Sequence, residues 1–189
     1  MEPKIIGISG KIGSGKSTLS KIIQKKLSKV EYQEWNFADN LKKIVAILLG
    51  YTYEEIITTD VKSDFIPEID MNVRQVFQKV GTDCLRNNLH NDIWVISLML
   101  NYIKQNKPNI IIADVRFPNE AKFVLDHDGI LIRINRNLNS TNLVTNLEIN
   151  NHISETALDD FPFENIIENN GTIDDLENSF MNIINKIKN

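Results

Sequence analysis

The segment that most constrains this chain runs from Gly10 to Ser17 and fits the pattern G-x-x-x-x-G-K-[ST]. Residues 4–9 before it form a short apolar run that predicts a strand, and residues 16–29 after it predict a helix. A strand, a glycine-rich turn and a helix in this order are the context of a phosphate-binding loop. The alternative is a glycine-rich turn that carries Lys-Ser by chance, and this context disfavours it. The sequence therefore predicts a nucleoside triphosphate site.

The residue types of this loop suit phosphate chemistry. Glycine lets the backbone turn its N–H groups toward an anion, and the N-terminus of the following helix adds partial positive charge. We expect Lys16 to reach the β- and γ-phosphates and the Ser17 hydroxyl to hold Mg²⁺. The predicted ATP- and phosphate-binding residues are Lys11, Gly13, Ser14, Gly15, Lys16, Ser17 and Thr18.

Length and charge exclude several other classes of protein. A chain of 189 residues suits one domain, here residues 1–189, with a sizeable core. The net charge of -4 argues against stable nucleic-acid binding, because phosphate backbones favour basic faces. No apolar run is long enough to span a membrane. The single cysteine, Cys84, cannot form an internal disulfide, so we expect a reducing, cytoplasmic compartment.

Strand and helix patterns alternate along the chain and predict an α/β fold. We expect a mostly parallel five-stranded sheet with helices on both faces. Two stretches, 59–70 and 135–152, are predicted as loops. The other predicted strands are 30–37, 109–114, 130–134 and 165–168, and the other predicted helices are 41–49, 53–58, 72–80, 93–105, one beginning at Pro118, and 172–188.

Ligands of such sheets bind beyond the carboxyl ends of the strands. The phosphate-binding loop, Asp39, Asp114 and Arg136 each follow a predicted strand, so we expect them to face one cleft. Asp114 is predicted to hold the Mg²⁺ shell together with Ser17, although an aspartate there could also cap a helix or a turn.

Longer stretches resemble a known family. They are Phe37-Ala38-Asp39-Asn40-Leu41-Lys42, the pattern R-Q-x-x-Q-x-x-G-T-D-x-x-R over residues 74–86, Trp94, the pattern D-x-R-F-P-N-E over residues 114–120, and His152-Ile153-Ser154-Glu155. Together they resemble the deoxynucleoside monophosphate kinases of bacteriophages and large DNA viruses. The resemblance implies a three-layer P-loop kinase fold and transfer of the γ-phosphoryl group of ATP, with Mg²⁺, to a (deoxy)nucleoside monophosphate. It also allows a homodimer.

The resemblance assigns roles to residues of this chain. Lys16, Asp114, Arg116 and Arg136 are the implied catalytic residues, because phosphoryl transfer depends on positioning and on stabilising charge. A lid is expected at about 135–152 with Arg133 and Arg136, and Arg133 could equally be structural. The acceptor region is expected at about 37–95, with Asp39, Lys42, Arg74, Gln75, Gln78, Gly81, Thr82, Asp83, Arg86 and Trp94.

The sequence differs from the family pattern in the phosphate-binding loop, and several of the assigned residues also have a simpler structural explanation. Ser17 and Ile12 stand where the family often has an aspartate and a basic residue, and Lys11 could substitute for the latter. Capping could explain Asp39 and the pair Gly81-Thr82, Arg116 could form a surface salt bridge, and Trp94 could be core. Phe37, Phe77 or Trp94 could stack on the base. For His152, packing or a hydrogen bond is a better explanation than metal binding.

Two other functions stay open at this point. One is another small-molecule kinase on the same scaffold, of the dephospho-coenzyme A or phosphomevalonate type. The other is a noncatalytic ATP-binding protein. A GTPase is disfavoured because the chain has no N-K-x-D motif.

Overall fold

The computed structural model describes residues 2–58, 60–137 and 153–188 and divides the chain into two compact units. The first unit comprises Met1–Asn36 and Lys104–Asn189, and the second comprises Phe37–Ile103. Each unit is described by itself. The region predicted to bind the acceptor, about 37–95, falls inside the second unit.

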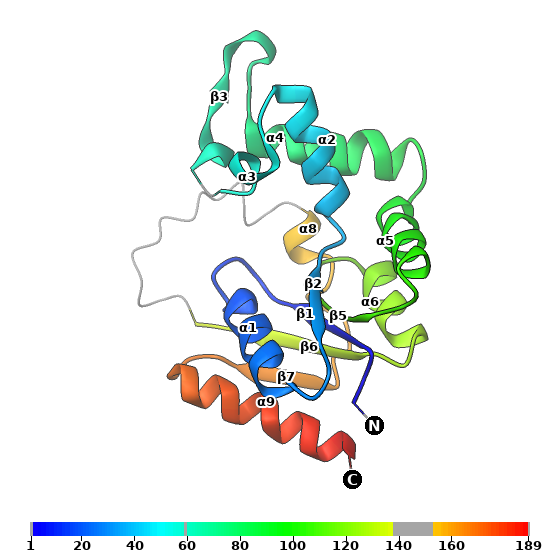
Figure 1. The fold of residues 1–189 in the computed structure, drawn as a ribbon. Coiled ribbons are helices and arrows are strands. Elements are labelled where there is room, and N and C mark those ends of the chain that lie inside the picture. Colours follow the sequence, from blue (N-terminus) through cyan, green and yellow to red (C-terminus); the bar gives the residue numbers. More distant parts are fainter. Residues whose placement is uncertain (1, 59, 138–152, 189) are drawn as a thin grey trace. The chain divides into compact units, whose positions relative to one another are not determined.

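The first unit is built on a five-stranded sheet in which every neighbouring pair is parallel (Figure 1). All residues of the strand before the phosphate-binding loop are buried, which fits a strand covered on both faces. The predicted fold class and the five predicted strands are confirmed. The strand order is β2-β5-β1-β6-β7, with β1 at Ile5–Ser9, β2 at Tyr32–Trp35, β5 at Asn109–Val115, β6 at Ile130–Asn135 and β7 at Asn165–Glu168.

Helices cover both faces of this sheet. Helices α1 (Lys16–Lys26) and α9 (Ile173–Lys188) pack on the face that carries Ile6 and Ile8. Helix α6 (Pro118–Asp126) packs on the opposite face, where a Cβ at Gly7 would lie 2.8 Å from Val124. A short helix, α8 (Ile153–Thr156), precedes β7. The unit is therefore a three-layer sandwich, as predicted.

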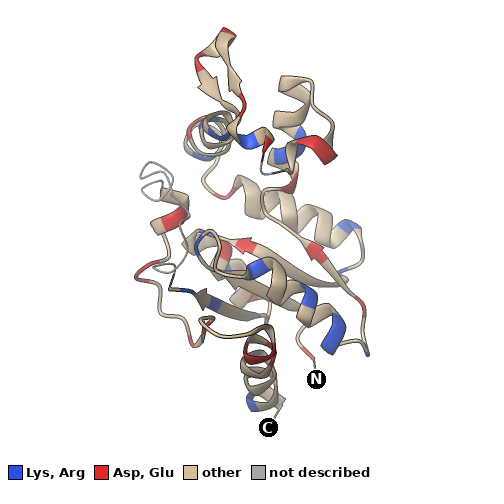
Figure 2. Ribbon diagram, turned by 90° about the vertical axis from the view of Figure 1, so that its left-hand side faces the viewer, with Lys and Arg blue, Asp and Glu red and all other residues tan. Residues whose placement is uncertain are grey.

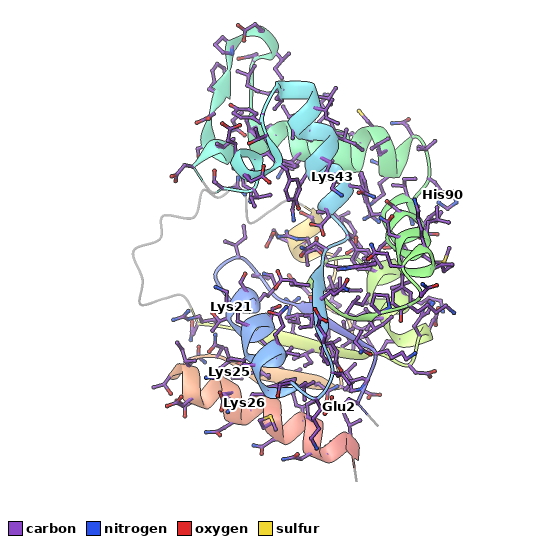
Figure 3. The ribbon with its side chains drawn as sticks, in the orientation of Figure 1. Glu2, Lys21, Lys25, Lys26, Lys43 and His90 are labelled. Carbon is purple, nitrogen blue, oxygen red and sulfur yellow. The ribbon has the colours of Figure 1, made fainter. Side chains whose placement is uncertain are left out.

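Charged side chains on the outside of α1 are largely solvent-facing. Figure 3 labels Lys21, Lys25 and Lys26 along this helix, and all three are exposed. Lys26 forms an ion pair with Glu177 of α9, which joins the two helices on the same face of the sheet. No helix within the described residues has both the length and the apolar character needed to cross a membrane.

Two helix ends differ in detail from the sequence predictions. Helix α1 ends at Lys26 instead of continuing to residue 29, because Leu27 leaves helical geometry with φ −94° and ψ 39°. After α6 the left-handed residue is Asp128, with φ 53°. Gly129 is needed for space, since a Cβ there would lie 2.6 Å from the carbonyl oxygen of Val124.

The second unit is helical apart from one small hairpin. Its core consists of Val45, Ala46, Ile56, Val73 and Val76. The elements are α2 (Asp39–Leu49), α3 (Tyr53–Ile56), the 3₁₀ turns Val61–Ser63 and Pro67–Ile69, the antiparallel strands β3 (Phe65–Ile66) and β4 (Met71–Asn72), α4 (Val73–Gln78), the π-helix η3 (Lys79–Asn87) and α5 (Ile93–Lys104), whose last residue belongs to the first unit.

Three sequence predictions for the second unit are wrong. Asp39 is the first residue of α2, not its N-cap; Ala38 occupies the cap position without a side-chain bond. The stretch 59–70, predicted as a loop, contributes β3 and both 3₁₀ turns. The helix predicted to end at Gly81 continues as η3, because Gly81 does not adopt the left-handed conformation of a C-cap. Gly81 instead packs against Leu41, and its carbonyl oxygen accepts from the indole of Trp94.

Candidate functional site

The loop after β1 turns on glycines. Gly13 and Gly15 have φ values of 78° and 106°, which residues with a side chain rarely adopt. The N–H of Ser14 donates to the carbonyl oxygen of Lys11 over 3.2 Å and closes the turn. Gly15 stands at the N-cap of α1, so the first N–H groups of the helix have no intrahelical acceptor. This is the backbone geometry that a phosphate-binding loop requires.

Lys16 reaches back over this loop. Its Nζ donates to the carbonyl oxygens of Gly10 and Lys11 over 2.6 and 2.9 Å. Burial lowers the pKa of Lys16 from 10.5 to about 8, with a further lowering by the cation of Arg116. The carboxylates of Glu155 and Asp114 raise this pKa, and Arg133 lowers it. Two further cations and two carboxylates, from separate segments of the chain, therefore lie close enough to the Lys16 ammonium to affect its pKa.

A bulge brings Asp114 to the site. Gly7 pairs with Ile112 and Ser9 pairs with Val115, so β5 has one more residue than β1 between these two pairs. Such an extra residue bends a strand and changes the direction of its side chains, often beside active sites. Asp114 lies at the carboxyl end of β5, close enough to Lys16 for its charge to raise the lysine pKa.

A magnesium ion would find suitable oxygen donors here. Ser17 is exposed in the first turn of α1, and its hydroxyl and the Asp114 carboxylate are the hard oxygen ligands that Mg²⁺ prefers. Among residues 2–58, 60–137 and 153–188, no group of three or more His, Cys, Asp and Glu side chains is arranged to hold a metal. The remaining ligands would be phosphate oxygens and water, as is usual for Mg²⁺ beside nucleotides.

Arg116 is held by two carboxylates. Its guanidinium forms an ion pair with Glu155 of α8, whose side chain is only 7% exposed. Its backbone N–H donates to Glu120 over 2.8 Å, and the N–H of Phe117 donates to the same oxygen. The salt bridge expected as the plain alternative for Arg116 therefore exists, and its acidic partner is buried rather than at the surface.

Arg133 lies in the second half of β6 and pairs with Ser9, the residue before the phosphate-binding loop. Its guanidinium donates to the hydroxyl of Ser9 and to the carboxylate of Asp159, each over 3.2 Å. It also lies over the ring of Phe163, 5.5 Å from the ring centre. The other oxygen of Asp159 accepts from Lys11 over 3.0 Å. Asp159 thus links two cations, and Figure 2 shows basic and acidic segments interspersed on this unit.

The predicted lid is described only at its start. Arg136 is exposed and lies one residue beyond β6. Residues 138–152, which include His152, lie outside the described part of the chain. The lid and the role of Arg136 stay predictions.

The predicted acceptor residues lie in the second unit, where the first of them form a small polar cluster. The Asp39 carboxylate accepts from Lys42 over 2.8 Å and from the hydroxyl of Tyr53 over 3.2 Å. Gln75 forms a capping box with Asn72 at the start of α4, so its side chain has a helix-capping role. The remaining polar candidates follow in the same run, with Arg74 and Gln78 on α4 and Thr82 and Asp83 on η3.

Arg86 and Trp94 are buried, at 5% exposure each. Arg86 donates to the carbonyl oxygen of Asn91 over 2.9 Å, and the indole N–H of Trp94 donates to that of Gly81 over 3.0 Å. A Cβ at Gly81 would lie 2.6 Å from Leu41, so this glycine is required by close packing. These contacts favour the core reading of Trp94.

Sequence reasoning missed three polar residues that contact the phosphate-binding loop or its cations. Glu155 is named in the sequence analysis only as part of the stretch His152-Ile153-Ser154-Glu155, and Asp159 is not singled out. Asn169 has no role in the sequence predictions, yet its side chain donates to the carbonyl oxygen of Ser14 over 2.8 Å. No local pattern marks such residues, because their partners lie far away in the sequence.

Comparisons with known proteins point to one family. The family model described as deoxynucleotide monophosphate kinase matches residues 52–180, a range that begins after the phosphate-binding loop. The chain is 32% identical, over 145 residues, to a putative deoxynucleotide monophosphate kinase of Acanthamoeba polyphaga mimivirus, covering 70% of this chain and 74% of that protein. It is 30% identical, over 89 residues, to the deoxynucleoside-5'-monophosphate kinase of Escherichia phage T5, covering 44% of this chain and 36% of that protein.

A solved structure supports the fold. The dephospho-CoA kinase of Campylobacter jejuni superposes with a TM-score of 0.51 over 97% of this chain and 96% of that chain. The two sequences are 14% identical, so this likeness concerns the fold alone.

Proposed function

The chain belongs to the deoxynucleotide monophosphate kinase family and is a nucleotide kinase, and we propose that it transfers the γ-phosphoryl group of ATP to a deoxynucleoside monophosphate. The observation that carries the donor half of this proposal is the gathering of Lys16, Arg116 and Arg133 around the glycine-rich loop. Two anionic substrates must approach each other for this reaction, and fixed cations offset their repulsion.

The loop and Lys16 would bind the triphosphate. Backbone N–H groups of Gly13 to Ser17 would bind phosphate oxygens, and Lys16 would turn from the carbonyl oxygens of Gly10 and Lys11 to the β- and γ-phosphates. Ser17 and Asp114 would hold Mg²⁺, which neutralises charge on the β- and γ-phosphate oxygens when it is bound.

Two arginines would act on the transferred group. Arg116 is held by Glu155 and Glu120, and Arg136 would come from the lid. An arginine presents a planar fork that matches phosphate oxygens, so each could stabilise charge that spreads over the equatorial oxygens. The chemistry needs no strong general base, because a monophosphate oxygen is already a nucleophile. Closing a lid would exclude water and limit ATP hydrolysis.

The second unit would bind the acceptor. Arg74 and Arg86 are the proposed monophosphate contacts, and Asp39, Lys42, Gln75, Gln78, Thr82 and Asp83 supply donors and acceptors for a sugar or base. Arg86 is buried and fixed by Asn91, which would give a bound phosphate a well-positioned cation. The π-helix that carries Thr82, Asp83 and Arg86 supports this proposal, since π-helical turns are frequent at functional sites.

A coupled assay of ADP release with Mg-ATP and every common ribo- and deoxyribonucleoside monophosphate tests the proposal. We expect release that depends on the acceptor and is fastest with one or more deoxynucleotides. Lys16→Ala should abolish most of this turnover, whereas Lys21→Ala, which changes an exposed lysine on the same helix, should leave it unchanged. Turnover with dephospho-coenzyme A or phosphomevalonate alone would replace the proposed acceptor. ATP binding without turnover on any acceptor would refute the kinase assignment for this chain.

A further inference from the structure

Asn169 lies in the segment between β7 and α9 and is 9% exposed. Its backbone N–H donates to the carbonyl oxygen of Asn135 over 2.7 Å, which continues the pairing of β7 with β6 by one residue. The main chain of Asn169 is therefore fixed by the sheet. Its side chain is a buried amide on a rigid support.

This amide contacts the phosphate-binding loop. Nδ2 of Asn169 donates to the carbonyl oxygen of Ser14 over 2.8 Å. A Cβ at Gly15 would lie 2.4 Å from the same nitrogen, closer than packed atoms can approach. Gly15 is thus required both for its φ of 106° and for the space that Asn169 occupies.

The contact fixes the orientation of one peptide group. In a planar trans peptide the C=O and the N–H point in opposite directions. Because the Ser14 carbonyl is held toward Asn169, the N–H of Gly15 points to the other side of the chain. The adjacent N–H groups of Lys16 and Ser17 begin α1 and have no acceptor within that helix. Correct alignment of this run of donors decides how well the loop binds an anion.

We propose that Asn169 is a positioning residue for the phosphate-binding loop. Its side chain holds the peptide between Ser14 and Gly15 in the orientation that binds nucleotide. The inference rests on the proposed function only in that the anion is a nucleotide phosphate. It assigns Asn169 no contact with the nucleotide. Asn169 directly follows β7, and it acts on the loop that follows β1.

The first test compares Asn169→Ala with Asn165→Ala in the full chain. Asn165 is the matched control because it lies on β7 and its side-chain amide also donates to a backbone carbonyl, that of Leu131, over 3.3 Å. We expect the dissociation constant for Mg-ADP, measured by calorimetry, to rise about tenfold in Asn169→Ala and less than twofold in Asn165→Ala. The affinity for a deoxynucleoside monophosphate should be unchanged in both.

Asn169→Asp separates the hydrogen bond from packing. The carboxylate has nearly the same shape but cannot donate to the Ser14 carbonyl, so Mg-ADP should bind at least as weakly as to Asn169→Ala. A normal affinity in Asn169→Asp would overturn the inference. Lower thermal stability in Asn169→Ala with unchanged Mg-ADP affinity would also overturn it, because this residue would then be only structural.

A second measurement needs no nucleotide and stays informative if the proposed kinase reaction is wrong. Amide hydrogen exchange of the nucleotide-free chain reports local opening of the loop. We expect faster exchange in Asn169→Ala at Ser14 and Leu19, whose N–H groups donate to the carbonyl oxygens of Lys11 and Gly15, and wild-type rates there in Asn165→Ala. Unchanged exchange in Asn169→Ala would overturn the inference even if the enzyme proves to be an active kinase. Faster exchange with wild-type nucleotide affinity would overturn it as well.

Discussion

The lowered pKa of Lys16 predicts that nucleotide affinity depends on pH. Burial, followed by the nearby cation of Arg116, lowers this pKa from 10.5 to about 8. A phosphate oxygen beside Nζ favours the charged lysine, so the pKa of Lys16 is higher with nucleotide bound than without. The affinity for nucleotide is therefore highest at pH values below the pKa of Lys16 in the free protein. The affinity falls as the pH rises above about 8, and it stops falling above the pKa that Lys16 has with nucleotide bound.

The size of the effect follows from the fraction of free protein in which Lys16 is charged. With a pKa of about 8, that fraction is about nine-tenths at pH 7, about half at pH 8 and about one-tenth at pH 9. The dissociation constant for Mg-ADP should therefore rise about twofold from pH 7 to pH 8 and about tenfold from pH 7 to pH 9.

Calorimetric titration with Mg-ADP at constant ionic strength between pH 7 and pH 9 measures this dependence. Lys16→Arg is the matched control, because arginine keeps its charge throughout this range. Its affinity should not change with pH, whatever its absolute value. A constant affinity in the wild type, or the same slope in Lys16→Arg, would refute the reasoning.

Three further outcomes are expected. Glu155→Gln removes a carboxylate that raises the pKa of Lys16, so the midpoint of the same pH titration should move below that of the wild type, and an unmoved midpoint would contradict the placement of Glu155. Trp94→Phe keeps an aromatic ring but loses the hydrogen bond to the carbonyl oxygen of Gly81. Urea denaturation should show that the free energy of unfolding is lower by about 1 kcal/mol, and an unchanged value would show that this bond does not stabilise the protein. Arg136→Ala should lower kcat by on the order of 10³ while the affinity for ATP changes little, as measured by steady-state kinetics and calorimetry. A loss of ATP affinity with unchanged kcat would show that Arg136 only binds ATP.

The sheet and the loop could be predicted because their signals are local. Each buried strand is a short run of β-branched residues, and the motif from Gly10 to Ser17 has a backbone requirement that few other sequences meet. Parallel pairing then brings the carboxyl ends of the strands to one edge. For this reason, reasoning from the sequence could also find Asp114, whereas Arg116 and Arg133 were assigned only through the family resemblance.

Predictions failed where local signals competed with packing. Gly81 has the appearance of a helix C-cap, but Leu41 and Trp94 pack against it and the helix continues as a π-helix. Charges and a proline between residues 59 and 70 suggested a loop, whereas this stretch supplies one strand of a hairpin. Asp39 looked like an N-cap, and its carboxylate bonds instead to Lys42 and Tyr53.

By itself, the sequence determined the fold class, the phosphate-binding loop and the residues that follow the strands, because periodicity and glycine geometry act over a few residues. Only the tertiary structure decided which side chains support that loop. Glu155 pairs with Arg116, Asp159 joins Lys11 to Arg133, and Asn169 holds the Ser14 carbonyl. These partners are far apart in the chain and meet because the order of strands in the sheet brings them together, and no short-range pattern encodes that order.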